Sequence, residues 1–155
     1  MNSVLQILPL LTFIGFGYVL SRIDIREHRL PNRLVLQATV SVAVCEVIAS
    51  SAAHPSSDLR TVSVTTGKTF LVYVLLYLLS RGQFGLGDVK YSIVVGLIAG
   101  WYFPDQWLLA IALAFGAAAL VSIGLLIGRR MNRNSRIPFG PYMTAATIVL
   151  ALISR

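Results

Sequence analysis

The chain has 155 residues, of which 56% are hydrophobic and only 12% are charged, and its mean hydropathy is +0.77. A water-soluble domain of this size needs a polar surface that so few charges cannot supply, so the composition excludes a soluble domain and predicts one membrane domain over residues 1–155. The single cysteine, Cys45, excludes an intramolecular disulfide and a cysteine-rich metal site.

Six apolar runs follow one another along the chain, and they predict an all-α polytopic membrane protein with six transmembrane helices. A helix needs about 20 apolar residues to cross the hydrocarbon core. The first run has neither the basic start nor the small-residue cleavage site of a signal peptide, so we expect a mature helix there. Gly96 with Gly100, and Gly124 with Gly128, have the spacing of closely packed helices. The runs are 4–21, 34–51, 61–79, 88–102, 106–127 and 138–153.

Basic residues gather in every second connection between these runs. Ten of the thirteen Lys and Arg residues lie in the first, third and fifth connections, whereas the second and fourth are nearly uncharged. Positive residues stay on the cytoplasmic side of membrane proteins, so these three connections are predicted to face the cytoplasm and both termini to face outward. This placement accounts for the net charge of +7 without a nucleic-acid partner. The ten residues are Arg22, Arg26, Arg29, Arg33, Arg81, Lys90, Arg129, Arg130, Arg133 and Arg136.

Three of the six acidic residues, Asp24, Glu46 and Asp88, fall within or at the edge of an apolar run. Acidic groups at membrane depth are costly and usually functional. Glu46 and Lys68 lie at similar depths below the outer surface when counted from their shared loop, so we predict a structural ion pair between them. A transport relay is the alternative interpretation of these two residues.

Asp24 and Asp88 are predicted to lie together at the cytoplasmic edge of the membrane, because the first run ends just before Asp24 and the fourth begins at Asp88. Two carboxyl groups that approach closely cannot both ionise cheaply, so they share one proton. The ionised member can activate a water and the protonated member can hydrogen-bond a scissile carbonyl, which requires no metal or cofactor. Each residue also has a simpler interpretation. Asp24 would cap the next segment or pair with Arg26, and Asp88 would be the N-cap of the fourth helix.

Glycine and proline residues lie beside both aspartates. Gly85 and Gly87 precede the second aspartate, and glycine permits a tight turn and close approach of the backbone to a ligand. Pro31 and Asn32 follow the first aspartate in a turn that is predicted to start the second helix. The stretch 138–141 opens the sixth run irregularly, because its two prolines lack a backbone N–H. Irregular backbone at membrane depth is tolerated where it is buried or lines a cavity, so we expect a cavity at this face.

These segments resemble the motifs of the type IV prepilin peptidases. The stretch 24–32, Asp-Ile-Arg-Glu-His-Arg-Leu-Pro-Asn, resembles the first motif of that family. The stretch 85–90, Gly-Leu-Gly-Asp-Val-Lys, resembles its glycine-aspartate motif, and 137–142, Ile-Pro-Phe-Gly-Pro-Tyr, its proline-rich segment. The order of the motifs and the number of helices also match, so the resemblance spans nearly the whole chain.

The resemblance implies a membrane aspartic endopeptidase that removes the leader of prepilins or pseudopilins at the cytoplasmic face of a bacterial or archaeal cell membrane. It places Asp24 and Asp88 at the catalytic positions. Larger members carry a cytosolic insertion with paired cysteines and methylate the new amino terminus, so we expect this chain to lack methyltransferase activity. Asn32 stands where larger members often carry an acid, which is similar to the shorter, tight-adherence (Flp-type) branch. The residues expected to shape the site and bind substrate are Pro31, Asn32, Gly85, Gly87, Lys90, Pro138, Phe139, Gly140 and Pro141.

Two other functions fit parts of the sequence. A small transporter or channel subunit would use Glu46, Lys68 and the two aspartates as an ion path, although a transporter more naturally places its carboxylates near the bilayer midplane. A catalytically silent structural subunit of a pilus or secretion machine would not require the two aspartates. The lipid bilayer is a partner in all three cases, and the sequence predicts no particular oligomeric state.

Overall fold

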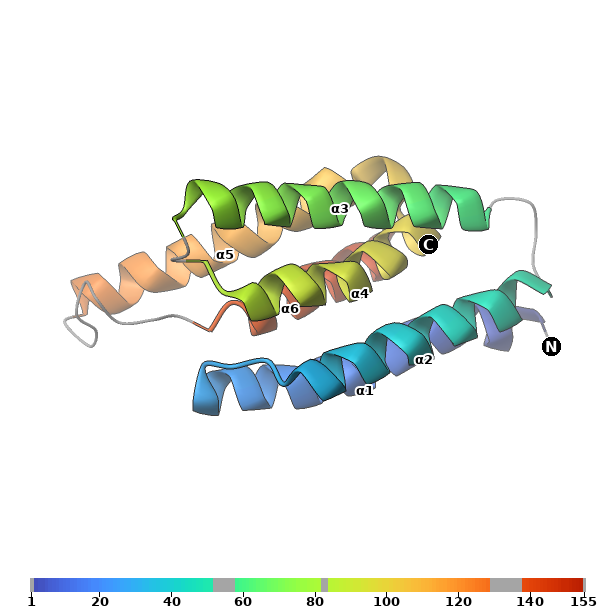
Figure 1. The fold of residues 1–155 in the computed structure, drawn as a ribbon, viewed down its shortest axis with the longest axis horizontal. Coiled ribbons are helices and arrows are strands. Elements are labelled where there is room, and N and C mark those ends of the chain that lie inside the picture. Colours follow the sequence, from blue (N-terminus) through green and yellow to red (C-terminus); the bar gives the residue numbers. More distant parts are fainter. Residues whose placement is uncertain (1, 52–57, 82–83, 129–137, 155) are drawn as a thin grey trace.

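The chain folds into six α-helices and one short 3-10 helix in a computed structural model that describes residues 2–51, 58–81, 84–128 and 138–154. The predicted all-α fold with six helices is confirmed (Figure 1). The basic connection that holds Arg129, Arg130, Arg133 and Arg136 lies outside the described residues. The elements are α1 (Asn2–Glu27), α2 (Asn32–Ser51), α3 (Leu59–Leu79), α4 (Leu86–Tyr102), η1 (Pro104–Gln106), α5 (Trp107–Ile127) and α6 (Gly140–Ile153).

Four stretches are both long and apolar enough to cross a membrane: Leu5–Glu27, Asn32–Ser51, Leu59–Leu79 and Pro104–Ile127. Helices α4 and α6 are shorter, with 17 and 14 residues. At about 1.5 Å per residue they are roughly 26 and 21 Å long, against a hydrocarbon core of about 30 Å. Figure 1 shows that α4 and α6 begin further inside the bundle than the nearby ends of α3 and α5.

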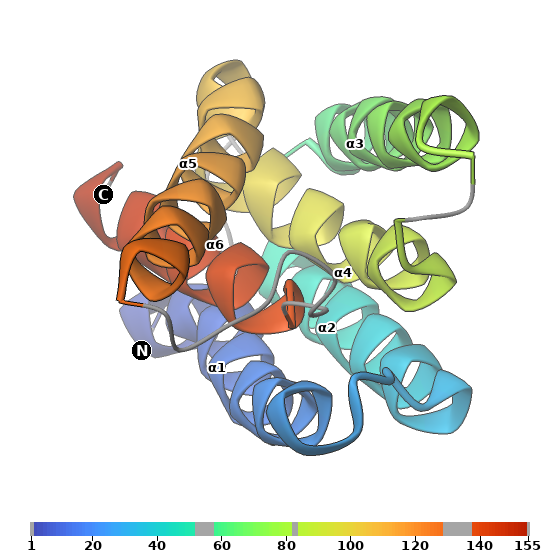
Figure 2. The ribbon, with the colours of Figure 1, turned by 90° about the vertical axis from the view of Figure 1, so that its left-hand side faces the viewer.

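Helix α4 lies at the centre of the bundle and packs against all five other α-helices (Figure 2). Its closest neighbour is α3, because two glycines bring the two backbones together. A Cβ atom at Gly96 would lie 2.7 Å from the Cα of Thr66, and one at Gly100 would lie 2.6 Å from the Cα of Val62. The predicted packing role of these glycines is confirmed. Within the described residues a Cβ atom at Gly124 would meet nothing within 4 Å, so Gly124 does not bring two described helices of this chain together.

The predicted ion pair between Glu46 and Lys68 is wrong. Glu46 is 1% exposed and its Oε1 atom has no hydrogen-bond partner within the described part of the chain, whereas Lys68 is exposed. Lys68 instead lines a pocket with Asp58 and Asp105. A count of residues from the loop does not determine on which face of its helix a side chain lies. Helix α3 turns its threonines inward on either side of Lys68, which leaves the lysine pointing out.

Candidate active site

Asp24 lies in the last turn of α1 and is buried, with 5% of its surface exposed. The helix ends because His28 adopts a left-handed conformation with φ of 50° and donates its N–H to the carbonyl of Asp24 over 2.9 Å. A left-handed residue is a common way to end an α-helix. The chain then turns sharply, and α2 starts at Asn32 as predicted. This turn keeps Asp24 facing the interior of the bundle.

The Asp24 carboxylate is held by the start of α6. Its Oδ2 atom accepts a hydrogen bond of 2.8 Å from the N–H of Gly140, the first residue of that helix. Pro141 has no N–H to offer, so Asp24 takes a donor at a helix end whose positive dipole favours a negative charge. Asp24 therefore caps α6 and does not cap the segment that follows it in sequence. A Cβ atom at Gly140 would lie only 3.0 Å from Oδ2, so only glycine fits this approach comfortably.

Asp88 is the third residue of α4, whose N-cap is Gly85. The interpretation of Asp88 as the N-cap is therefore wrong. A Cβ atom at Gly85 would lie 2.8 Å from Oδ2 of Asp88, so the carboxylate folds back over a residue that has no side chain. Asp24 and Asp88 both line the same pocket. The structure thus brings together two carboxyl groups that are 64 positions apart in the sequence (88 − 24).

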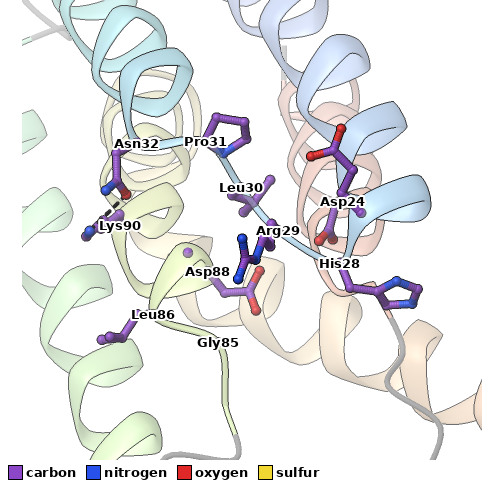
Figure 3. A pocket seen from close by; sticks show the side chains of 12 residues that line it. Asp24, His28, Arg29, Leu30, Pro31, Asn32, Gly85, Leu86, Asp88 and Lys90 are labelled. Atoms are coloured by element: carbon purple, nitrogen blue, oxygen red, sulfur yellow. Dashed lines mark hydrogen bonds between the residues drawn. The ribbon is translucent and has the colours of Figure 1, made fainter.

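Both aspartates line one pocket of about 530 Å³, a volume typical of ligand sites (Figure 3). It contains five of the residues predicted to shape the site: Pro31, Asn32, Gly85, Gly87 and Lys90. Of the proline-rich segment, Gly140 touches Asp24 from behind and Phe139 lines a neighbouring groove, while Pro138 and Pro141 line neither. Sequence reasoning did not select the other lining residues, which are Glu27, His28, Arg29, Leu30 and Leu86. Most of them lie in the stretch 24–32, so its resemblance to the first motif of the family was the signal that could have identified them.

Two contacts tie the first motif to the second. Leu30 is buried and packs on Gly87, where an added Cβ atom would lie 3.0 Å from that of Leu30. Lys90 donates a hydrogen bond of 2.9 Å from Nζ to Oδ1 of Asn32 at the start of α2 (Figure 3). The loop after Asp24 and the first turn of α4 are thereby fixed against each other, which sets the position of both aspartates.

A buried polar layer lies one helical turn behind the pocket. The Thr144 hydroxyl donates to the carbonyl of Gly140 over 2.9 Å and accepts from Tyr91 over 2.8 Å and from Ser21 over 3.3 Å. Gly17 makes room for this contact, since a Cβ atom there would lie 2.5 Å from Thr144. Ser21, Tyr91 and Thr144 stand three or four residues from Asp24, Asp88 and Gly140 respectively. The layer therefore joins the three helices that carry the site.

Comparison with known proteins places these features in a family. The model of the type IV leader peptidase family matches residues 11–154. The chain belongs to the type IV leader peptidase family. The matched range includes both aspartates, the glycine segment before Asp88 and the proline-rich start of α6. The resemblance seen in the motifs is thus confirmed.

Two curated proteins are similar to this family member. A prepilin leader peptidase/N-methyltransferase of Bacillus subtilis (strain 168) is 23% identical over 150 residues, which cover 96% of this chain and 56% of the relative. The leader peptidase HopD of Escherichia coli is 34% identical over 84 residues, which cover 53% of each protein. The chain spans about half the length of these relatives. No solved structure shows a significant match.

Proposed function

We propose that this chain is a membrane aspartic endopeptidase that cleaves the leader from type IV prepilins or pseudopilins, with Asp24 and Asp88 as its catalytic pair. The observation that carries the proposal is the lining of one pocket by both aspartates, within a chain of the leader peptidase family. The residues around the pair support it, since Gly85, Gly87 and Gly140 each remove a side chain from a point of close approach.

The two aspartates have different surroundings, and these suggest separate roles. Asp24 accepts the Gly140 N–H at the positive end of α6, which favours its ionised form. Asp24 then serves as the base that takes a proton from water, while Asp88 holds the shared proton and donates a hydrogen bond to the scissile carbonyl. Water attacks the carbonyl carbon while Asp24 takes its proton and Asp88 gives its proton to the carbonyl oxygen, so that a neutral tetrahedral diol forms between the two side chains. As the diol collapses, one hydroxyl returns a proton to Asp88, the C–N bond breaks, and the proton held by Asp24 passes to the departing amine.

The substrate is a prepilin whose basic leader remains in the cytoplasm and whose apolar helix lies in the membrane. Such a substrate presents its scissile bond at the cytoplasmic edge of the bilayer. The pocket lies at the end of the bundle where Arg22, Arg26 and Arg33 surround the turn after Asp24, which supports a cytoplasmic position for this end. Figure 1 shows both chain ends toward the opposite end of the bundle, in agreement with termini outside the cell membrane.

Methyl transfer is not part of the proposed activity. Cys45, the single cysteine of the sequence, lies within α2 with its sulfur 3.4 Å from the hydroxyl of Thr12, so these 155 residues hold no cysteine pair. The ion-path alternative loses its main support, because Glu46 and Lys68 do not pair.

The proposal is tested by producing the chain in bacterial cells together with a tight-adherence prepilin, in a host that lacks its own prepilin peptidase. Loss of the leader, measured by the intact mass of the pilin, is expected only when the chain is present. The same mass shows whether the new amino terminus carries a methyl group, and we expect none. A panel of prepilins that all retain their leaders would refute the proposal.

A further inference from the structure

A second, apolar depression adjoins the candidate active site at Asp88. We call it the aromatic groove. It has a volume of about 320 Å³ and shares Asp88 and Gly85 with the larger pocket, so the two are continuous through the proposed catalytic aspartate. The residues that line the aromatic groove are Phe84, Gly85, Asp88, Phe115, Ala118, Ala119, Ser122 and Phe139.

Three aromatic rings form one wall of the groove. The ring centres of Phe115 and Phe139 are 4.5 Å apart, and those of Phe84 and Phe139 are 5.6 Å apart. These rings come from α5, from the start of α6 and from the segment before α4, so three separate elements build the wall. Tyr73 of α3 supports it from the buried side. The wall is therefore a defined part of the fold, held in place by contacts among its own rings.

Helix α5 contributes Phe115 to the aromatic wall, and its other side chains in the groove are small. Ala118 and Ala119 leave space there, and the Ser122 hydroxyl is already used, because it donates to the carbonyl of Ala118. Among the described residues that line the groove, Asp88 carries the one charged side chain and most of the others are apolar. Its chemistry favours an apolar side chain placed directly beside a catalytic carboxyl group.

The two cavities that meet at Asp88 differ in polarity. The larger pocket carries charged side chains, including Glu27, Arg29 and Lys90, whereas the groove is aromatic and aliphatic. A prepilin has the same asymmetry about its scissile bond, with a polar leader before it and an apolar helix after it. An extended substrate that crosses the aspartate pair in one direction places polar residues in the polar pocket and apolar residues in the groove.

We propose that the aromatic groove is the binding site for the apolar side chain that immediately follows the scissile bond, and that its size selects the first residue of the mature pilin. This inference rests on the proposed peptidase function and adds the specificity site to it. Phe84, Phe115 and Phe139 contact the substrate side chain. Ala118 and Ala119 determine how large that side chain can be.

The groove can be filled without disturbing the core, because Ala119 is exposed on α5. In Ala119→Phe the new ring occupies space that a substrate side chain would use. Ala117 supplies a matched control, since it is an exposed alanine on the same helix and is not among the residues that line the groove. Two versions of one prepilin serve as probes, with Phe or Ala as the first residue after the scissile bond.

Wild type is expected to cleave both versions. Ala119→Phe is expected to cleave the Phe version at least about tenfold more slowly than the Ala version, the order of discrimination that pocket size gives in apolar sites. Cleavage of the Ala version then shows that the variant is folded, and Ala117→Phe is expected to behave as wild type. Equal effects of Ala119→Phe on both versions, or none on either, would overturn the proposal and indicate that lipid rather than substrate contacts the groove. A wild type that cleaves neither version would instead refute the peptidase function, and the specificity site with it.

Discussion

Replacement of Gly140 by alanine tests how closely the start of α6 holds the Asp24 carboxylate. The added Cβ atom would lie 3.0 Å from Oδ2 and 3.5 Å from the Cβ and Cγ of Asp24, so the carboxylate must move by a few tenths of an ångström. That movement lengthens the 2.8 Å hydrogen bond from the Gly140 N–H. A hydrogen bond to a charged group contributes about 1.5–3 kcal/mol, and each 1.4 kcal/mol corresponds to about tenfold in rate. We therefore expect Gly140→Ala to lower the cleavage rate by roughly 10- to 100-fold.

The same substitution is expected to leave the fold intact. Alanine is preferred over glycine within a helix by about 0.5–1 kcal/mol, which offsets the local crowding at Asp24. The assay compares leader removal from a purified prepilin in detergent with the thermal unfolding of the same preparation. Gly67→Ala is the matched control, since an added Cβ atom at Gly67 of α3 meets nothing within 4 Å. Wild-type cleavage by Gly140→Ala would refute the idea that this contact positions the catalytic carboxylate.

Three further predictions concern the contacts around the pocket. Gly87→Val is expected to destabilise the protein by about 1–3 kcal/mol by overpacking against Leu30, and Leu30→Gly in the same chain, which removes the Cβ atom at the closest contact, should reduce that cost. Thermal unfolding of both single variants and the double variant measures this coupling, and additive effects would contradict it. Gly100→Ala should lower the unfolding temperature because it forces α4 away from the backbone of α3, and an unchanged temperature would contradict the packing. Asn32→Ala and Lys90→Met should each slow cleavage a few-fold, and the double variant should be no slower than the worse single variant, because both remove one hydrogen bond. If the two single-variant reductions in cleavage rate multiply in the double variant, Asn32 and Lys90 act independently and the prediction is contradicted.

The sequence was sufficient to predict much of the fold and the position of the pair. Six apolar runs predicted six helices. The alternation of basic connections predicted that Asp24 and Asp88 lie at the same end of the bundle, and both line one pocket there. The length of an apolar run and the position of basic residues are both set by where the chain lies along the membrane normal. Both can therefore be read from a single sequence. The turn at Pro31 and Asn32 was predictable for a local reason, because proline restricts its own backbone and that of the residue before it.

Features that depend on the rotation of a helix about its axis were not predictable. Glu46 is buried whereas Lys68 is exposed, and the inward threonines of α3 became evident only from packing. The cap that Asp24 supplies to α6 joins residues 116 positions apart (140 − 24), so no local rule identifies it. The aromatic groove likewise requires rings from three elements to meet, and in the sequence each ring resembles an ordinary apolar residue.

The central claim is that Asp24 and Asp88 act as one catalytic pair on the peptide bond of a prepilin. The most direct measurement is the rate of leader removal by purified Asp24→Asn and Asp88→Asn, each of which keeps the shape of the side chain and removes its ability to exchange a proton. Asp58→Asn and Asp105→Asn are controls, because both residues are exposed and line a different pocket. We predict no detectable cleavage by either pair variant and wild-type cleavage by both controls. Cleavage at the wild-type rate by either Asp24→Asn or Asp88→Asn, in folded protein, would contradict the claim.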